Sequence, residues 1–77
     1  MKKKSEKKEF IDPELAKQLR EAREKKGLTQ LEASIIADVS ETFFAQTERS
    51  EVNPSFAKLS RMFKAVGLEL STKKIKP

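Results

Sequence analysis

Two hydroxyl side chains, Thr29 and Ser40, each stand directly before a run of helix-forming residues. At such positions the hydroxyl oxygen accepts hydrogen bonds from backbone N–H groups that lack a partner inside the helix, so the spacing predicts two helix starts. We expect short helices over 30–37 and about 41–49, joined by a turn at Asp38-Val39, where aspartate tolerates turn geometry. Two short helices around a tight turn form a helix-turn-helix, whose second helix commonly enters the DNA major groove.

Side chains suited to catalysis are scarce in the 77 residues. There is no His and no Cys, which excludes a disulfide and a His/Cys metal site. The chain has only two Gly and no glycine-rich phosphate loop, and its carboxylates pair only on polar helix faces, where solvation explains them. An enzyme is therefore the least expected class, and no cofactor is predicted. A core of this size is marginal, which leaves oligomerisation as a source of stability.

The net charge of +5 is unevenly distributed. Residues 1–28 carry a net charge of +4 and residues 49–77 a net charge of +5, whereas residues 29–48 carry −4 and contain no Lys or Arg. Basic flanks favour an acidic partner such as DNA. The acidic helix-turn-helix between them is unusual for a DNA reader and keeps a protein-interaction function open.

A longer helix is predicted to precede the helix-turn-helix. Asp12-Pro13-Glu14 combines a cap, a proline suited to the first helical position and an acid that complements the helix dipole. Leu15, Leu19 and Ala22 recur at helical spacing, and Gly27 supplies a stop. This helix should cover one side of the core.

The two short helices should each present one face to the core. In the first of them Ala33, Ile36 and Ala37 are expected to point inward, with Leu31 and Ile35 as less certain members. In the second, Phe44 should point inward and Glu48, four residues on, should lie near the same face.

After a loop over 50–53, Ser55 is expected to cap a fourth helix that ends at Gly67. Its apolar residues follow helical spacing, and we interpret them as core: Phe56, Leu59, Met62, Phe63 and Val66. The sequence thus predicts a mainly α fold, a small helical bundle containing a helix-turn-helix.

Three parts are expected: a flexible basic N-terminal arm over 1–10, the helix-turn-helix domain over 11–67, and a dimerisation strand with a basic tail over 68–77. Leu68, Leu70 and Thr72 alternate with polar residues, as in a β-strand. Since no other segment reads as a strand, its simplest partner is the same strand of a second copy, and this predicts a homodimer.

The chain lacks an apolar run of roughly 20 residues, as a membrane span requires. Its N-terminus also lacks the apolar region of a signal peptide. We therefore expect a cytoplasmic protein with no membrane partner.

The spacing of many residues resembles the Xre family, the Cro/repressor-type helix-turn-helix proteins, over about residues 13–67. The positions that carry the resemblance are Leu15, Leu19, Arg23, Gly27-Leu28-Thr29-Gln30, Val39-Ser40, Glu48-Arg49, Asn53-Pro54-Ser55, Leu59 and Gly67. The end GLELSTKK and the start DPELAKQLREAREKKGLTQ look most like HipB-type antitoxins, and HigA-type antitoxins share much of the pattern. The resemblance implies a lambda-repressor-like DNA-binding fold with a C-terminal strand paired across the dimer.

The resemblance also implies residue roles. A salt bridge would join Arg23 and Glu48, and Gln30 would touch phosphate. The full set of implied DNA contacts is Thr29, Gln30, Ser40, Glu41, Thr42, Phe43, Gln46, Arg49, Asn53 and Ser55. Glu41 departs from the family because it puts a carboxylate at a groove-facing position. This carboxylate repels phosphate, although it can accept a hydrogen bond from cytosine N4.

We interpret Thr42 and Gln46 as better candidates for base contact than Glu41 or Phe43, which could contact a thymine methyl group. The favoured function is a sequence-specific repressor that binds an inverted-repeat operator as a homodimer. The HipB-type resemblance adds an antitoxin role, in which the chain binds a HipA-like kinase toxin and represses its own operon. The alternative is a protein-interaction module, or a HigA-type antitoxin, with weak or no sequence-specific DNA binding.

Overall fold

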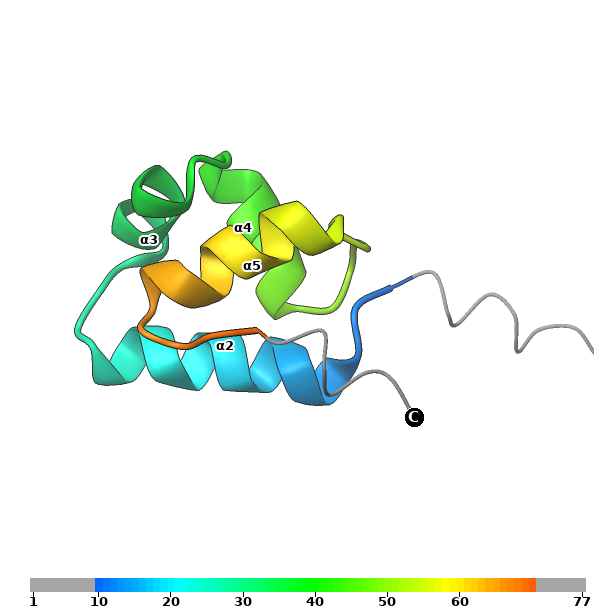
Figure 1. Cartoon of the computed structure of the whole chain (residues 1–77), viewed down its shortest axis with the longest axis horizontal. Helices are drawn as coiled ribbons and strands as arrows, with labels where there is room; N and C mark the ends of the chain where they lie inside the picture. The colour runs from blue at the N-terminus through cyan, green and yellow to red at the C-terminus, as the bar shows by residue number, and fades with distance from the viewer. Residues whose placement is uncertain (1–9, 71–77) are drawn as a thin grey trace, which may run out of the picture.

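The computed structural model describes residues 10–70, in which four helices enclose one core (Figure 1). These are α2 (Pro13–Lys25), α3 (Gln30–Ala37), α4 (Glu41–Glu48) and α5 (Phe56–Ala65). α4 and α5 each pack against both α2 and α3. The prediction of a small helical bundle is confirmed, and α3 with α4 forms the helix-turn-helix. No helix within the described range is both long and apolar enough to cross a bilayer.

Each helix begins at a side chain that accepts a backbone hydrogen bond, as the sequence predicted. At the start of α3 the cap is reciprocal: Thr29 Oγ1 accepts from the Glu32 N–H at 3.0 Å, and the Glu32 carboxylate accepts from the Thr29 N–H at 2.8 Å. The other three caps are Asp12, Ser40 and Ser55. A cap of this kind is worth about 1 kcal/mol, so the helix starts are fixed locally.

The turn between α3 and α4 passes through Asp38 in the left-handed conformation, with φ of 62° and ψ of 48°. Aspartate enters this region more readily than most residues, which explains how the turn forms without glycine. Arg61 of α5 holds the same turn, since its Nε donates to the Ala37 carbonyl at 2.8 Å and its Nη2 to the Asp38 carbonyl at 3.2 Å. The turn is thereby attached to the core helix behind it.

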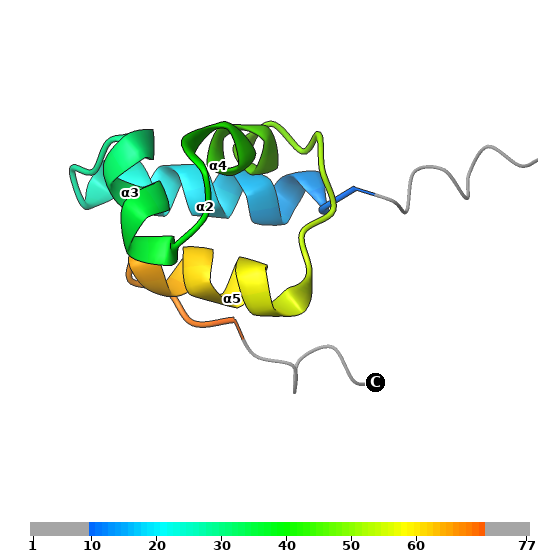
Figure 2. The same ribbon diagram turned by 90° about the horizontal axis from the view of Figure 1, so that it is seen from above.

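The core is centred on Leu19, Phe44 and Met62, none of which is exposed to solvent. α3 contributes only small side chains to it, namely Ala33, Ser34 and Ala37. Small residues allow α3 to approach its neighbours closely, and Figure 2 shows α3 at one end of the bundle, between α2 and α5. The predicted inward position of Phe44 is confirmed.

Four of the apolar residues that the sequence analysis considered for the core do not lie in it. The prediction for Ile36 was wrong, since it is 59% exposed, and the less certain Leu31 and Ile35 are exposed as well. The inward face of α3 is already filled by residues 33, 34 and 37, which leaves Ile36 on the outer face of the helix. Phe56, expected in the core, is 44% exposed because it is the first residue of α5, at the edge of the bundle.

The chain leaves α5 at Gly67, whose φ of 87° favours glycine. Leu70 packs against the core, whereas Leu68 is exposed. Residues 68–70 form no strand in this single chain. The predicted dimerisation strand continues to Thr72, which lies outside the described residues, so strand pairing stays a prediction, as does the basic arm over 1–10.

Candidate nucleic-acid interface

The first turn of α4 presents a row of polar side chains to solvent. Ser40, Glu41 and Thr42 are exposed, and Gln46, one turn further along, is partly exposed. Phe43 is half-buried and packs against the core. The N-terminal residues of the second helix of a helix-turn-helix contact base edges in the major groove. The structure therefore places Ser40, Glu41, Thr42 and Phe43 at the N-terminal end of α4, where such contacts are made, and Gln46 one turn further along.

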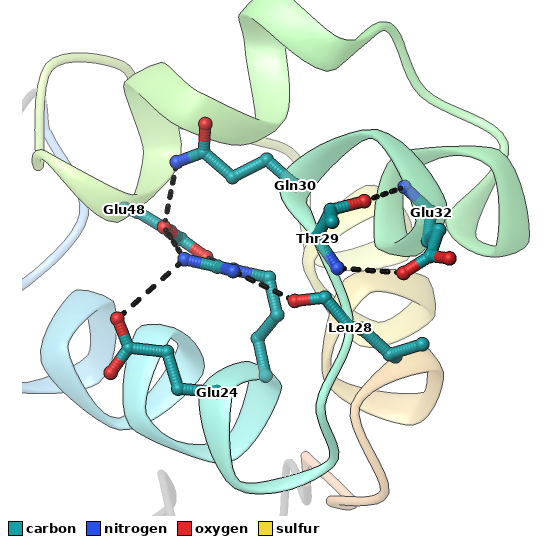
Figure 3. A network of polar contacts seen from close by, with 7 residues as sticks. Glu24, Leu28, Thr29, Gln30, Glu32 and Glu48 are labelled. Atoms are coloured by element: carbon teal, nitrogen blue, oxygen red, sulfur yellow. Dashed lines mark hydrogen bonds and ion pairs between the residues drawn. The ribbon is translucent and has the colours of Figure 1, made fainter.

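The buried side chain of Glu48 fixes the position of α4 through a network of hydrogen bonds (Figure 3). Its carboxylate accepts from Arg23 Nε at 2.6 Å and from Arg23 Nη2 at 3.1 Å, and these bonds join α4 to α2. The same carboxylate accepts from Gln30 Nε2 at 2.9 Å, which joins α4 to the start of α3. The side chain of Glu48 is only 2% exposed. One buried carboxylate thus sets the position of α4 relative to both neighbouring helices.

Arg23 has a second partner inside the protein. Its Nη1 donates to the Leu28 carbonyl at 2.8 Å, in the segment that connects α2 to α3. The hydrogen bond to Glu48 raises the pKa of Arg23 above its ordinary value, while burial acts in the opposite direction. Arg23 therefore keeps its charge at neutral pH, and the resemblance-based pairing of Arg23 with Glu48 has bidentate geometry here.

Gln30 lies at the start of α3, where a phosphate contact was expected. Its side-chain amide donates to Glu48 and so points toward α4 (Figure 3). An amide nitrogen carries two hydrogens, and the second is available to a DNA phosphate. In this arrangement Gln30 links the internal network to the surface on which the backbone contact is expected.

Three predicted DNA contacts already use their hydroxyl oxygens as helix caps. Thr29, Ser40 and Ser55 each accept one backbone hydrogen bond. A hydroxyl group also has one hydrogen to donate, so capping leaves each side chain able to bond to a phosphate oxygen. Each of the three side chains is exposed enough for such a contact.

Arg49, which follows α4, is engaged by Glu51. Its Nε and Nη2 each donate to the Glu51 carboxylate at 3.1 Å, and both side chains are at least half exposed. The hydrogen bond from Arg49 lowers the pKa of Glu51, so the pair persists at neutral pH and is lost only as the pH falls through that lowered value. Asn53 is exposed in the following loop.

Sequence reasoning missed three residues around this surface: Glu51, Lys58 and Arg61. The spacing of Glu51, two residues after an arginine, was a usable signal for the ion pair. Lys58 and Arg61 reach α4 and the α3–α4 turn from α5, and no local pattern indicates that. Polar residues buried in the helix-turn-helix itself need no ligand, because Ser34 and Thr47 donate to carbonyls within their own helices at 2.8 Å.

The profile of the helix-turn-helix domain family matches residues 14–72, which is most of the chain. The chain belongs to this family. It is accordingly a DNA-binding regulator by class, with α4 in the position of the second helix. A search of curated proteins found no match to this chain.

Two solved structures share the fold. The restriction-modification controller protein C.AhdI from Aeromonas hydrophila superposes with a TM-score of 0.70 at 24% identity, over 74% of this chain and 86% of that one. The clp gene regulator ClgR from Corynebacterium glutamicum gives a TM-score of 0.70 at 28% identity, over 74% of this chain and 61% of that one. The match therefore spans less than two thirds of the ClgR chain.

Proposed function

We propose that this chain is a sequence-specific transcriptional repressor that binds an inverted-repeat operator as a homodimer. The observation that carries the proposal is the exposed polar row on α4, held by the buried carboxylate of Glu48. Positioning of this kind suits base recognition, because bidentate contacts in the groove require a fixed helix. The similar folds of a restriction-modification controller protein and a clp gene regulator support a regulatory role.

Base contacts are assigned to Thr42 and Gln46, both on the accessible side of α4. Gln is suited to adenine and Thr to several bases. Glu41 is exposed beside them, and its carboxylate can accept a hydrogen bond from cytosine N4 although it repels phosphate. Apart from Phe43, the remaining predicted contacts serve the phosphate backbone: Thr29, Gln30, Ser40, Arg49, Asn53 and Ser55. Backbone contacts of this kind orient the domain without reading sequence.

We further propose that the repressor is the HipB-like antitoxin of a type II toxin–antitoxin operon in the cytoplasm. Support comes from the end GLELSTKK and the start of α2, which look like that group of antitoxins. In this role the chain binds a HipA-like kinase toxin and represses its own operon. Leu68, Leu70 and Thr72 would pair with the same strand of the second copy.

A second candidate, a protein-interaction module or a HigA-type antitoxin with weak DNA binding, is favoured by one surface. The outward face of α3 combines exposed Leu31, Ile35 and Ile36 with a stretch of chain that carries no Lys or Arg. Neither feature attracts phosphate. An enzymatic function has no support in the site, which is built of helix caps, a buried ion pair and solvated polar side chains.

Selection from a pool of random duplexes, repeated at two salt concentrations, tests the proposed function. Enrichment of an inverted repeat is expected, with half-sites about 34 Å or a multiple apart, together with strong salt dependence. Salt-sensitive binding without an enriched sequence would instead mean that the basic segments 1–28 and 49–77 bind phosphate while α4 recognises no base sequence. The second candidate would then replace the first.

Replacing Glu51 with glutamine is expected to strengthen DNA binding. The change frees Arg49 for phosphate and removes a negative charge next to it. One added phosphate contact per chain should steepen the slope of log K against log salt by about 1. The matched control is Glu21→Gln, an exposed acid on α2 with the same change in net charge. Equal behaviour of the two variants would show that releasing Arg49 from Glu51 adds no contact with DNA.

A further inference from the structure

A lysine from α5 lies over an aromatic ring of α4. Lys58 Nζ is 4.9 Å from the centroid of the Phe43 ring, within the range of a cation–π contact. Phe43 is the third residue of α4, and Lys58 is the third residue of α5. The ammonium group is thereby held beside the first turn of α4, the turn that carries Ser40, Glu41 and Thr42.

Lys58 brings positive charge to a region that has none of its own. Residues 29–48 contain no Lys or Arg. Arg49, the nearest arginine in sequence to α4, is bound by Glu51, whereas Lys58 has no carboxylate within 4.0 Å among residues 10–70. Within the described helix-turn-helix and its immediate surroundings, Lys58 is therefore a cation that remains available to an external anion.

Helix stability does not account for this lysine. A positive charge in the first turn of a helix opposes the helix dipole, and the first turn of α5 contains no acidic residue to offset it. The Phe43 ring supplies an attraction for the ammonium, but a lysine is not needed to cover a half-buried ring. The Phe43 ring is thus the one attraction for the Lys58 ammonium found among residues 10–70, and it leaves the charge free to bind an anion as well.

We propose that Lys58 is a binding site for a DNA backbone phosphate, with Phe43 as the residue that positions it. The inference deepens the proposed DNA-binding function and depends on it. A helix seated in the major groove has a phosphate backbone on each side, so a cation fixed beside its first turn faces that backbone. Phe43 then acts through Lys58 rather than by reading a base.

The test compares binding of the full-length chain to a selected operator and to an unrelated duplex over a range of salt concentrations. Lys58→Gln should weaken binding to both duplexes by the same factor and reduce the salt slope by about 1 per chain, because a phosphate contact carries no sequence information. The matched control is Lys64→Gln, an exposed lysine on α5 that lies six residues on, on a different side of the helix. Lys58→Arg should retain the slope.

Phe43→Leu provides the second readout, since leucine keeps an apolar side chain but removes the ring. It should reduce the salt slope while leaving the selected base sequence unchanged, and thermal unfolding of each variant confirms that it is folded. If the unmodified chain binds duplexes but Lys58→Gln matches Lys64→Gln, Lys58 only covers the ring and the inference is overturned. If the unmodified chain shows no salt-dependent binding, the proposed function fails as well.

Discussion

Replacing Arg23 with methionine is expected to lower the free energy of unfolding by about 3–5 kcal/mol, because the change leaves a buried carboxylate without its cation. Glu48 is 2% exposed, and after the substitution only the amide of Gln30 would remain bonded to it. Small domains have unfolding free energies near the lower end of the 5–15 kcal/mol range. The variant should therefore be largely unfolded at modest denaturant concentrations, as urea titration followed by circular dichroism will show.

Two further variants separate the buried pair from general charge effects. Glu24→Gln alters the weak contact of Arg23 with an acid whose side chain is 60% exposed, at 3.9 Å, and should change stability by less than about 1 kcal/mol. The double variant Arg23→Met, Glu48→Met removes both charges and should recover much of the loss. If Arg23→Met were no more destabilising than Glu24→Gln, the network would not be the element that holds α4.

Replacing Phe44 with alanine is expected to lower the free energy of unfolding by about 3–5 kcal/mol. Its ring is fully buried at the centre of the core, where α4 packs against α2 and α3, and its removal leaves a cavity that rigid helices fill poorly. Differential scanning calorimetry should show a much lower melting temperature. DNA binding should be lost as well, because Phe44 packs α4 against the core.

The control for Phe44 is the same truncation at Phe56, which is 44% exposed at the start of α5. That change removes roughly half as much buried surface as the change at Phe44 and should cost less, about 1–2 kcal/mol. Equal losses of unfolding free energy at the two positions would mean that the buried ring of Phe44 does not hold α4 in place. Together with the Arg23 variant, this comparison separates the polar attachment of α4 from its apolar attachment.

Local signals made the helix starts predictable. Thr29, Ser40 and Ser55 cap the helices that their positions indicated, because a cap depends only on the following three residues. Gly27 and Gly67 end helices for a similarly local reason, their positive φ angles. The turn at Asp38 was also predicted, although aspartate rather than glycine occupies the left-handed position.

Contacts between distant helices were not predictable in the same way. Ile36 was predicted to lie in the core because its side chain is apolar. The space between α3 and its neighbouring helices is filled by small side chains only. Arg61 and Lys58 reach across from α5, and nothing in their immediate sequence indicates it. The Arg23–Glu48 pair was anticipated only through family resemblance, since the two residues are 25 positions apart.

The outward aliphatic face of α3 also affects how stability varies with temperature. The heat-capacity change of unfolding grows with the apolar surface that becomes newly hydrated. Leu31, Ile35 and Ile36 are already 49%, 67% and 59% exposed in the folded chain, so unfolding newly hydrates only about half of their surface or less. The chain should therefore have a smaller heat-capacity change than its apolar content suggests. A smaller heat-capacity change gives a less curved plot of stability against temperature, so we expect weaker cold destabilisation than for a chain that buries these three side chains.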